Sequence, residues 1–151
     1  MRFWRIADFA DLSGEGGLVA PGRWHSKGRR IVYMSDHPAA SLIELLVRFQ
    51  IDPADIPDDY QLLTIDVAAE VVFDAVELSD LPPEWRQNRK VTQQIGDRWL
   101  SEANRVLLRV PSAIVPYAFN WLLNPSHADA GTARVAEKIR TPFDPRLLRR
   151  G

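Results

Sequence analysis

Several neighbouring strands predicted in this chain follow one another too closely to be joined by helices. Residues 62–67 and 71–76 are both rich in β-branched and apolar side chains, and three residues separate them. A crossover between parallel strands needs about a dozen residues or more, so gaps this short argue against a wholly parallel sheet. The sequence therefore predicts an α+β domain with a central mixed, mostly antiparallel sheet and flanking helices.

The remaining elements are predicted from apolar periodicity and from the positions of glycine and proline. Further strands are expected at residues 3–6, 31–35, 105–110 and 135–141, and helices at residues 39–49 and 88–103. The predicted buried stripe of the first helix consists of Leu42, Leu45, Leu46 and Phe49. Residues 11–17 and 112–131 are predicted to be loop and turn segments, because they combine polar residues with glycine or proline.

Composition bounds the class of protein. With 151 residues, 46% of them hydrophobic, the chain is long enough for one domain, residues 1–151, with a full core. The formal net charge of −1 gives no basic field, so direct nucleic-acid binding is not expected. No cysteine is present and the three histidines lack metal-ligand spacing, so no metal site is expected. Without a signal-peptide pattern or an apolar run of roughly 20 residues, a cytoplasmic protein without membrane contact is expected.

A polar turn between glycines, at residues 21–28, precedes the predicted strand at 31–35. Arg23 and Trp24 lie in this turn, Tyr33 lies in the strand, and the following helix carries Glu44. Cationic, aromatic and acidic groups that converge on a strand end are typical of a nucleotide-handling site.

Each of these residues also has a purely structural interpretation. Glu44 and Arg48 have the i,i+4 spacing of a solvated helix pair. Arg23 could be a solvated loop residue, and Trp24 and Tyr33 could be core residues. His25 has the character of a hydrogen-bonded loop residue. Composition and spacing alone leave both interpretations open.

Several motifs occur in the order found in one known family. They are Arg5-Ile6, Gly22-Arg23-Trp24, Val32-Tyr33-Met34-Ser35, Glu44-Leu45-Leu46-Val47, Ile95-Gly96-Asp97-Arg98-Trp99-Leu100, Val110-Pro111-Ser112-Ala113-Ile114-Val115-Pro116, Asn120, Asn124-Pro125-Ser126-His127 and Phe143-Asp144-Pro145-Arg146. Over nearly its whole length the chain resembles the RES domain. It departs from the family pattern at His25, where the family often has asparagine.

The resemblance implies the toxin of a bacterial type II toxin–antitoxin pair, with the fold of ADP-ribosyltransferase toxins and with NAD as substrate. The family's polar site positions match Arg23, Tyr33, Glu44 and Ser112, with Asn120 and His127 as weaker candidates for NAD contact. The implied partner is an Xre-like helix-turn-helix antitoxin that covers the pocket. We expect it to dock near Trp24, Arg23 and residues 14–17.

Cleavage of the nicotinamide–ribose bond explains the need for these residue types. Positive charge develops on the ribose, and the Glu44 carboxylate can stabilise it. The forked guanidinium of Arg23 suits the pyrophosphate, and Tyr33 or Trp24 can stack on a base. Ser112 can supply one orienting hydrogen bond, and this chemistry needs no metal.

The acceptor of ADP-ribose is left open by the sequence. Water or phosphate would make the protein an NAD-degrading enzyme, which the small size of the chain favours. A protein side chain would make it a mono-ADP-ribosyltransferase that modifies a host metabolic protein. Two alternatives come from other classes: a nuclease-like toxin that uses His25 and His127, and a binding module without catalytic activity.

Overall fold

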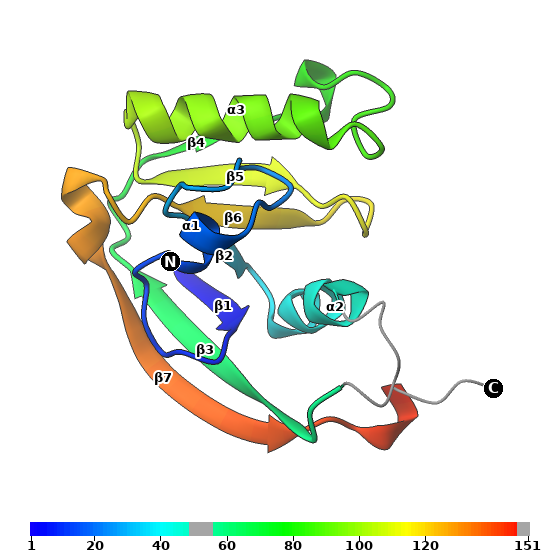
Figure 1. Ribbon diagram of the computed structural model, residues 1–151. Coiled ribbons are helices and arrows are strands. Elements are labelled where there is room, and N and C mark those ends of the chain that lie inside the picture. The colour runs from blue at the N-terminus through cyan, green and yellow to red at the C-terminus, as the bar shows by residue number, and fades with distance from the viewer. Residues whose placement is uncertain (49–55, 148–151) are drawn as a thin grey trace.

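A strongly curved mixed sheet forms the centre of the protein (Figure 1). The computed structural model describes residues 1–48 and 56–147, and within them the sheet has seven strands in the order β4-β5-β6-β2-β1-β3-β7. The strands are β1 Arg2–Ile6, β2 Val32–Ser35, β3 Asp59–Val67, β4 Phe73–Ala75, β5 Leu107–Pro111, β6 Phe119–Leu123 and β7 Ala133–Pro142. Neighbours are antiparallel except for the parallel pair β4 and β5. The predicted α+β class with a mixed, mostly antiparallel sheet is confirmed.

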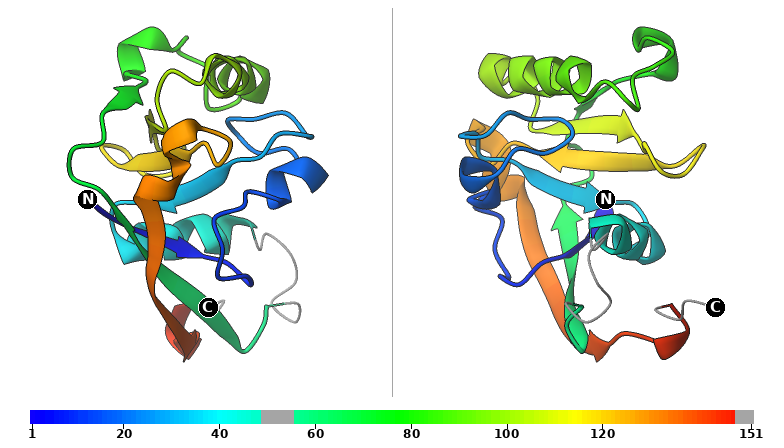
Figure 2. Two further views of the ribbon diagram at one scale, coloured as in Figure 1. Left: turned by 90° about the vertical axis from the view of Figure 1, so that its left-hand side faces the viewer. Right: turned by 45° about the vertical axis from the view of Figure 1, so that its right-hand side comes forward.

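The helices of the protein lie beside different strands of this sheet. They are α1 Gly16–Val19, α2 Pro38–Arg48 and α3 Arg89–Glu102, with the 3₁₀ turns η2 Leu78–Asp80, η3 Ala128–Thr132 and η4 Pro145–Leu147. Figures 1 and 2 show α3 lying across β5 and β6, whereas α2 lies beside β1 and β2. The two longer helices therefore cover different parts of the sheet.

The sheet has a narrow junction between β1 and β2. These two strands are paired only at Trp4 and Ser35, although β2 pairs fully with β6 and β1 pairs fully with β3. Beyond this pair the strands diverge, and the backbone carbonyl of Tyr33 accepts a hydrogen bond from Arg5 Nη1 at 3.1 Å. A side chain thus replaces the missing strand partner, and the sheet stays open at this point.

Apolar side chains fill both faces of the sheet, because successive residues of a strand point to opposite sides. Leu107 and Leu123 belong to one buried cluster with Phe3. Their chain neighbours Leu108 and Leu122 belong to a second cluster, which includes Trp99 of α3. Burial of both faces accounts for the continuous apolar runs in β5 and β6.

Strand β6 is an element that the sequence analysis missed, since residues 112–131 were expected to form turns. Its Trp121, Leu122 and Leu123 are buried, and the strand pairs with β2 on one side and β5 on the other. A short apolar run without alternation carries a weak local signal beside proline and asparagine. Two sheet neighbours, rather than local propensity, determine this strand.

Other elements differ from the prediction at their ends or in their burial. β4 is three exposed residues within the predicted 71–76, and α1 begins inside the predicted loop. Leu42, Leu45 and Leu46 of α2 are half-buried rather than buried, and Phe49 lies outside the described residues. Ser41 is the buried residue of α2, and its hydroxyl donates to the Trp4 carbonyl at 3.0 Å. The stripe is less buried than predicted, and one of its residues, Leu45, lines a pocket beside the helix.

Candidate active site

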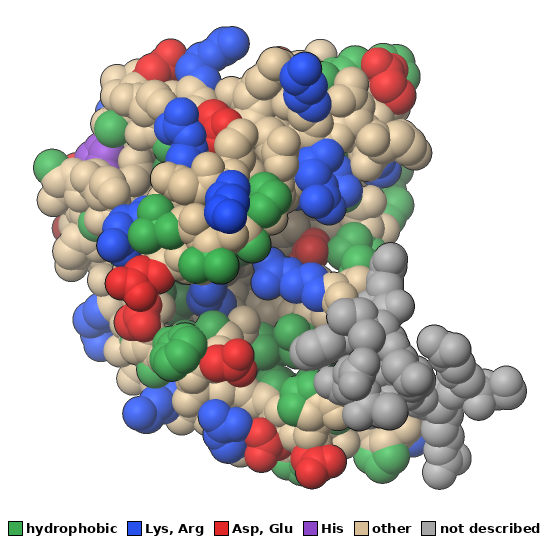
Figure 3. All heavy atoms as spheres, viewed as in Figure 1, with side chains coloured by type: hydrophobic (Ala, Val, Ile, Leu, Met, Phe, Trp, Pro, Cys, Tyr) green, Lys and Arg blue, Asp and Glu red, His purple; other side chains and the backbone are tan. Residues whose placement is uncertain are grey.

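A cleft lies between α2, the junction of β1 and β2, and the turn at residues 21–28. It has a volume of about 680 Å³, and a smaller pocket of about 50 Å³ adjoins its inner end. Figure 3 shows a hollow on this face with basic side chains around it. The residues that line both cavities are Arg5, Tyr33, Glu44, Arg48 and Asn120. Four different elements, β1, β2, α2 and β6, thus contribute polar side chains to one concave site.

Most of the residues predicted for the site meet at this cleft. Arg23, Trp24, Tyr33, Glu44 and Asn120 all line it, although up to 97 positions separate them in sequence. The expected convergence of cationic, aromatic and acidic groups therefore exists in the folded protein. The combination is that of a ligand cleft with a few placed polar groups.

Helix α3 holds the turn that carries Arg23. Gln93 donates to the Gly22 carbonyl at 2.9 Å, and Thr92 donates to the Arg23 carbonyl at 2.6 Å. One turn further along α3, the Asp97 carboxylate accepts the backbone N–H of Ser26 at 2.9 Å and its hydroxyl at 2.6 Å. Side chains from one helix therefore fix both ends of the turn.

Arg23 is half-buried at the edge of the cleft, and its Nη1 donates to the Arg86 carbonyl at 3.1 Å. Burial lowers its pKa, and the charge of Arg89 adds to this effect, whereas Glu44 opposes it. An arginine remains protonated under such conditions. The desolvated, crowded cation is accordingly well placed to attract an anion.

Tyr33 and His25 form a hydrogen-bonded pair beneath this turn, in which His25 is buried and Tyr33 is half-buried. The Nε2 atom of His25 lies 3.0 Å from the Ala20 carbonyl, which can only accept, so Nε2 carries the proton of the neutral ring. Nδ1 then accepts from the Tyr33 hydroxyl at 2.8 Å, and that oxygen accepts the Trp24 N–H at 3.0 Å. Burial raises the pKa of Tyr33 to about 12. The phenol therefore stays neutral and braces the turn.

His25 is expected to make stability depend on pH. It is 3% exposed, and burial lowers its pKa in the folded protein, so the unfolded chain binds a proton first as the pH falls below about 6.5. The free energy of unfolding should consequently decrease between pH 7 and pH 5, and His25→Gln should remove part of that slope. Urea denaturation of both proteins across this range measures the difference. Equal slopes of unfolding free energy against pH in the parent and in His25→Gln would contradict the assignment of this pH dependence to His25.

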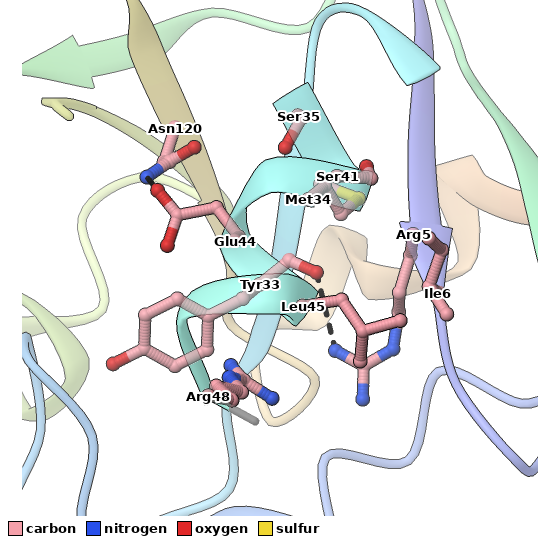
Figure 4. Close-up of a pocket in the computed structure, with 10 residues that line it drawn as sticks. All are labelled: Arg5, Ile6, Tyr33, Met34, Ser35, Ser41, Glu44, Leu45, Arg48 and Asn120. Carbon is pink, nitrogen blue, oxygen red and sulfur yellow. Dashed lines mark hydrogen bonds between the residues drawn. The ribbon is translucent and has the colours of Figure 1, made fainter. Parts of the chain in front are cut away.

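Glu44 points into the cleft and is held by an amide. Its Oε1 accepts a hydrogen bond from Asn120 Nδ2 at 2.7 Å, as Figure 4 shows. Among the described residues no ion pair joins Glu44 to Arg48, so the solvated helix pair is not formed. Its charge instead interacts with Arg23 across the cleft.

Three arginines of the cleft were not predicted as site residues. Arg5, Arg48 and Arg89 join Arg23 there, and Glu44 is the single acidic side chain among the described lining residues. Burial lowers the pKa of Arg5, and the charge of Arg48 adds to this effect. Arg5 is a strand residue between apolar neighbours, and its place in the family motif was the signal that could have found it. The cleft is therefore cationic although the chain carries a net charge of −1.

Ser112 and His127 are not among the lining residues. The Ser112 hydroxyl accepts the backbone N–H groups of Ile114 at 3.2 Å and Val115 at 3.1 Å, which shapes the loop between β5 and β6. His127 caps η3 by accepting the Asp129 N–H at 2.9 Å. Asn120 lies at the start of β6, at the cleft, whereas His127 follows the end of that strand. His25 and His127 therefore do not face one cavity.

Trp24 is 1% exposed and packs against Trp85 with ring centroids 6.2 Å apart. It borders the cleft from within the core, and the expectation that it would be an exposed docking group is wrong. The glycine-bracketed turn folds back on itself, so its aromatic side chain points inward while Arg23 faces the cleft.

The described residues contain neither a group of metal-ligating side chains nor a membrane-spanning helix. Across residues 1–48 and 56–147, no three His, Cys, Asp or Glu side chains are grouped closely enough to hold a metal ion. None of the helices described is both long and apolar enough to span a bilayer.

The fold and this site define an α+β domain built around a cationic cleft with one carboxylate. The chain belongs to the RES domain family, whose model matches residues 2–144. The resemblance predicted from the sequence motifs is confirmed.

Relatives and a solved structure agree with this family. The chain is 42% identical to a protein named Toxin Res from Pseudomonas putida, over 98% of this chain and all of the relative. It is 34% identical to the Prs ADP-ribosylating toxin of a Sphingobium species, over 98% and 97% of the two chains. The toxin–antitoxin complex MbcT–MbcA of M. tuberculosis contains a chain of similar fold, with a TM-score of 0.74, 18% identity and coverage of 97% and 86%. The relatives place the chain among the Res toxins.

Proposed function

We propose that this chain is a toxin that consumes NAD by cleaving its nicotinamide–ribose bond. The observation that carries the proposal is the Glu44 carboxylate, held by Asn120 in a cleft with four arginines. The name of one full-length relative, an ADP-ribosylating toxin, supports NAD as the substrate. A cleft of about 680 Å³ is in the size range of small-molecule sites.

Glu44 would act on the bond between ribose C1′ and the nicotinamide nitrogen. When this bond breaks, its electrons return to the ring, which leaves as neutral nicotinamide, and positive charge develops on the ribose. A fixed carboxylate stabilises that charge without having to reorganise. Water, phosphate or a protein side chain then forms the new bond to C1′, and the proton of that acceptor, where it carries one, is released to solvent. Oε2 takes no hydrogen bond from the described residues, so it is the oxygen available to the ribose.

The arginines would bind the diphosphate of NAD. Guanidinium groups pair with phosphate oxygens through two parallel hydrogen bonds. Arg23 and Arg89 interact electrostatically on one side of the cleft, and Arg5 and Arg48 interact in the same way next to the inner pocket. Because two like charges close together are unfavourable, each pair gains from a bound anion. Arg23, which also interacts electrostatically with Glu44, is the proposed diphosphate ligand.

NAD degradation, with water or phosphate as acceptor, is our first candidate, because the chain is a single small domain. Transfer of ADP-ribose to a host protein is the second, and the ADP-ribosylating relative specifically favours it. Both reactions start with the same bond cleavage, so they need the same Glu44.

Product analysis separates the two candidates. Purified protein is incubated with NAD labelled in its adenylate half, in phosphate and in phosphate-free buffer, with and without cell extract. Nicotinamide release without extract, with the label in small products, supports degradation. Release that needs extract, with the label on a protein, supports transfer to a protein. No release under any of these conditions would contradict NAD consumption.

Arg23→Lys is expected to weaken NAD binding more than it slows bond cleavage. Lysine keeps the positive charge but loses the forked geometry, so KM should rise by roughly 10-fold with a smaller change in kcat. Steady-state kinetics of nicotinamide release measures both constants. Arg98→Lys, at an exposed position of α3, is the matched control. Parent kinetics in Arg23→Lys would rule out the diphosphate role.

We also propose that an Xre-like antitoxin covers this cleft. An enzyme that destroys NAD must be inhibited during growth, and a cover over the mouth of the cleft would achieve this. Because Trp24 is buried, docking would use the rim, where Arg23 and Gly16 are accessible, with an acidic group of the antitoxin facing Arg23.

Antitoxin and NAD are expected to weaken each other's binding. If both occupy the cleft, linkage requires the reduction in affinity to be reciprocal. Calorimetric titration of NAD into the free toxin and into the preformed complex measures it. Full NAD affinity in a complex that no longer turns over would contradict occlusion.

A further inference from the structure

We infer that Asn120 is a positioning residue, whose amide orients the Glu44 carboxylate for the ribose; the inference rests on the proposed function. The sequence prediction placed Asn120 among the groups that contact NAD. In the structure its Nδ2 is already engaged, because it donates to Glu44 Oε1 at 2.7 Å. The distance is that of a strong hydrogen bond to a charged acceptor.

Asn120 is well suited to fix another side chain because its own backbone is fixed. It lies in β6, a central strand, where it is paired with Ser35 of β2 and with Val110 of β5. Glu44, in contrast, projects from α2 into open space at the edge of the cleft. A glutamate has three rotatable bonds, so without an anchor its carboxylate would occupy several orientations. The amide couples the helix side chain to a strand that is paired on both sides.

The hydrogen bond between Asn120 and Glu44 also determines which carboxylate oxygen of Glu44 is available to a substrate. Figure 4 shows the carboxylate turned towards Asn120, with Arg5 and Arg48 at the other end of the pocket. Without the amide, the carboxylate could turn towards these arginines and pair with them. Asn120 therefore keeps the negative charge at one end of the pocket and leaves the guanidinium groups for an anion.

Removing the amide should reduce catalysis without weakening substrate binding. Asn120→Ala is expected to lower kcat for nicotinamide release by roughly 10- to 100-fold, the effect of losing one hydrogen bond to a charged group. KM and the directly measured affinity for NAD should change less than threefold, because Asn120 itself does not hold the substrate. Thermal unfolding confirms that the variant is folded.

Asn120→Asp tests the same contact through pH. It places a second carboxyl group against Glu44, and two adjacent carboxyl groups resist simultaneous ionisation. The acid limb of the pH profile for kcat should move to higher pH by about one unit or more. The other titratable or charged groups around the cleft are the same in both proteins: Arg5, Arg23, His25, Tyr33, Arg48 and Arg89. Asn104→Asp, at an exposed position after α3, is the matched control and should keep the parent profile.

The outcomes separate this inference from the proposed function. A parent enzyme that releases nicotinamide, a lowered kcat in Asn120→Ala and a shifted profile in Asn120→Asp support a positioning role. Parent kcat in Asn120→Ala, or the parent profile in Asn120→Asp, would overturn the inference and leave the proposed function intact. Loss of NAD affinity equal to the loss of kcat/KM would overturn it in favour of direct binding. A parent protein that releases no nicotinamide would overturn both.

Discussion

Glu44→Gln is expected to lower the rate of nicotinamide release about 100-fold or more, with the fold retained. Glutamine has nearly the same shape as glutamate, and its carbonyl oxygen can still accept the hydrogen bond that Asn120 Nδ2 donates. Only the negative charge is removed, and with it the stabilisation of positive charge on the ribose. Initial rates at saturating NAD measure the effect. In a bacterial host the same substitution should abolish growth inhibition.

The matched control for this substitution is Glu70→Gln, at an exposed turn between β3 and β4. It removes the same charge from the chain and should keep the parent rate. If folded Glu44→Gln protein released nicotinamide as fast as the parent, the carboxylate would have no part in the cleavage.

Gly96→Ala is expected to destabilise the protein by about 1–3 kcal/mol, the usual cost of overpacking. A Cβ atom at this position of α3 would lie 1.7 Å from the Trp24 carbonyl oxygen, which belongs to the backbone. Either the helix or the turn must move, and the hydrogen bonds from Thr92 and Gln93 to that turn would lengthen. Urea denaturation measures the loss, and NAD affinity should also decrease because Arg23 is displaced.

Gly131→Ala provides the comparison for this second prediction. Gly131 lies in η3, and a Cβ there would meet no atom within 4 Å. The stability of the Gly131→Ala protein should therefore stay close to that of the parent protein. Equal effects of the two substitutions would show that close packing of α3 on the turn is not required.

The part of the site that the sequence could predict is local. Arg23 lies in a turn marked by glycines, and Glu44 stands out as a charge in an apolar helix, so both could be named from neighbouring residues. Tyr33 could be named from its neighbours in the same way, and the family motifs added Asn120; both residues line the same cleft. The task of Asn120 could not be predicted, because its partner Glu44 lies 76 positions away in sequence. The partner of Tyr33, His25, lies eight positions away, but their contact depends on how the turn folds back on itself.

The rest of the site depends on how the sheet opens between β1 and β2. β1 and β2 separate after one residue pair, and this brings Arg5 to the inner pocket. No local pattern in a short strand encodes such a separation, because it follows from the twist and pairing of the whole sheet. The same reason explains why β6 was missed, since its pairing with two strands outweighs the nearby turn residues. Trp24, an aromatic residue in a polar turn, belongs to the core, which is one of the two interpretations that the sequence left open.

The most direct test of the central claim is a crystal structure of the Glu44→Gln protein with NAD. The slowed variant should retain intact substrate long enough to observe it. Ribose C1′ is expected next to the substituted side chain, with the diphosphate against Arg23. NAD bound outside the cleft, or bound within it with the nicotinamide ribose far from position 44, would contradict the account.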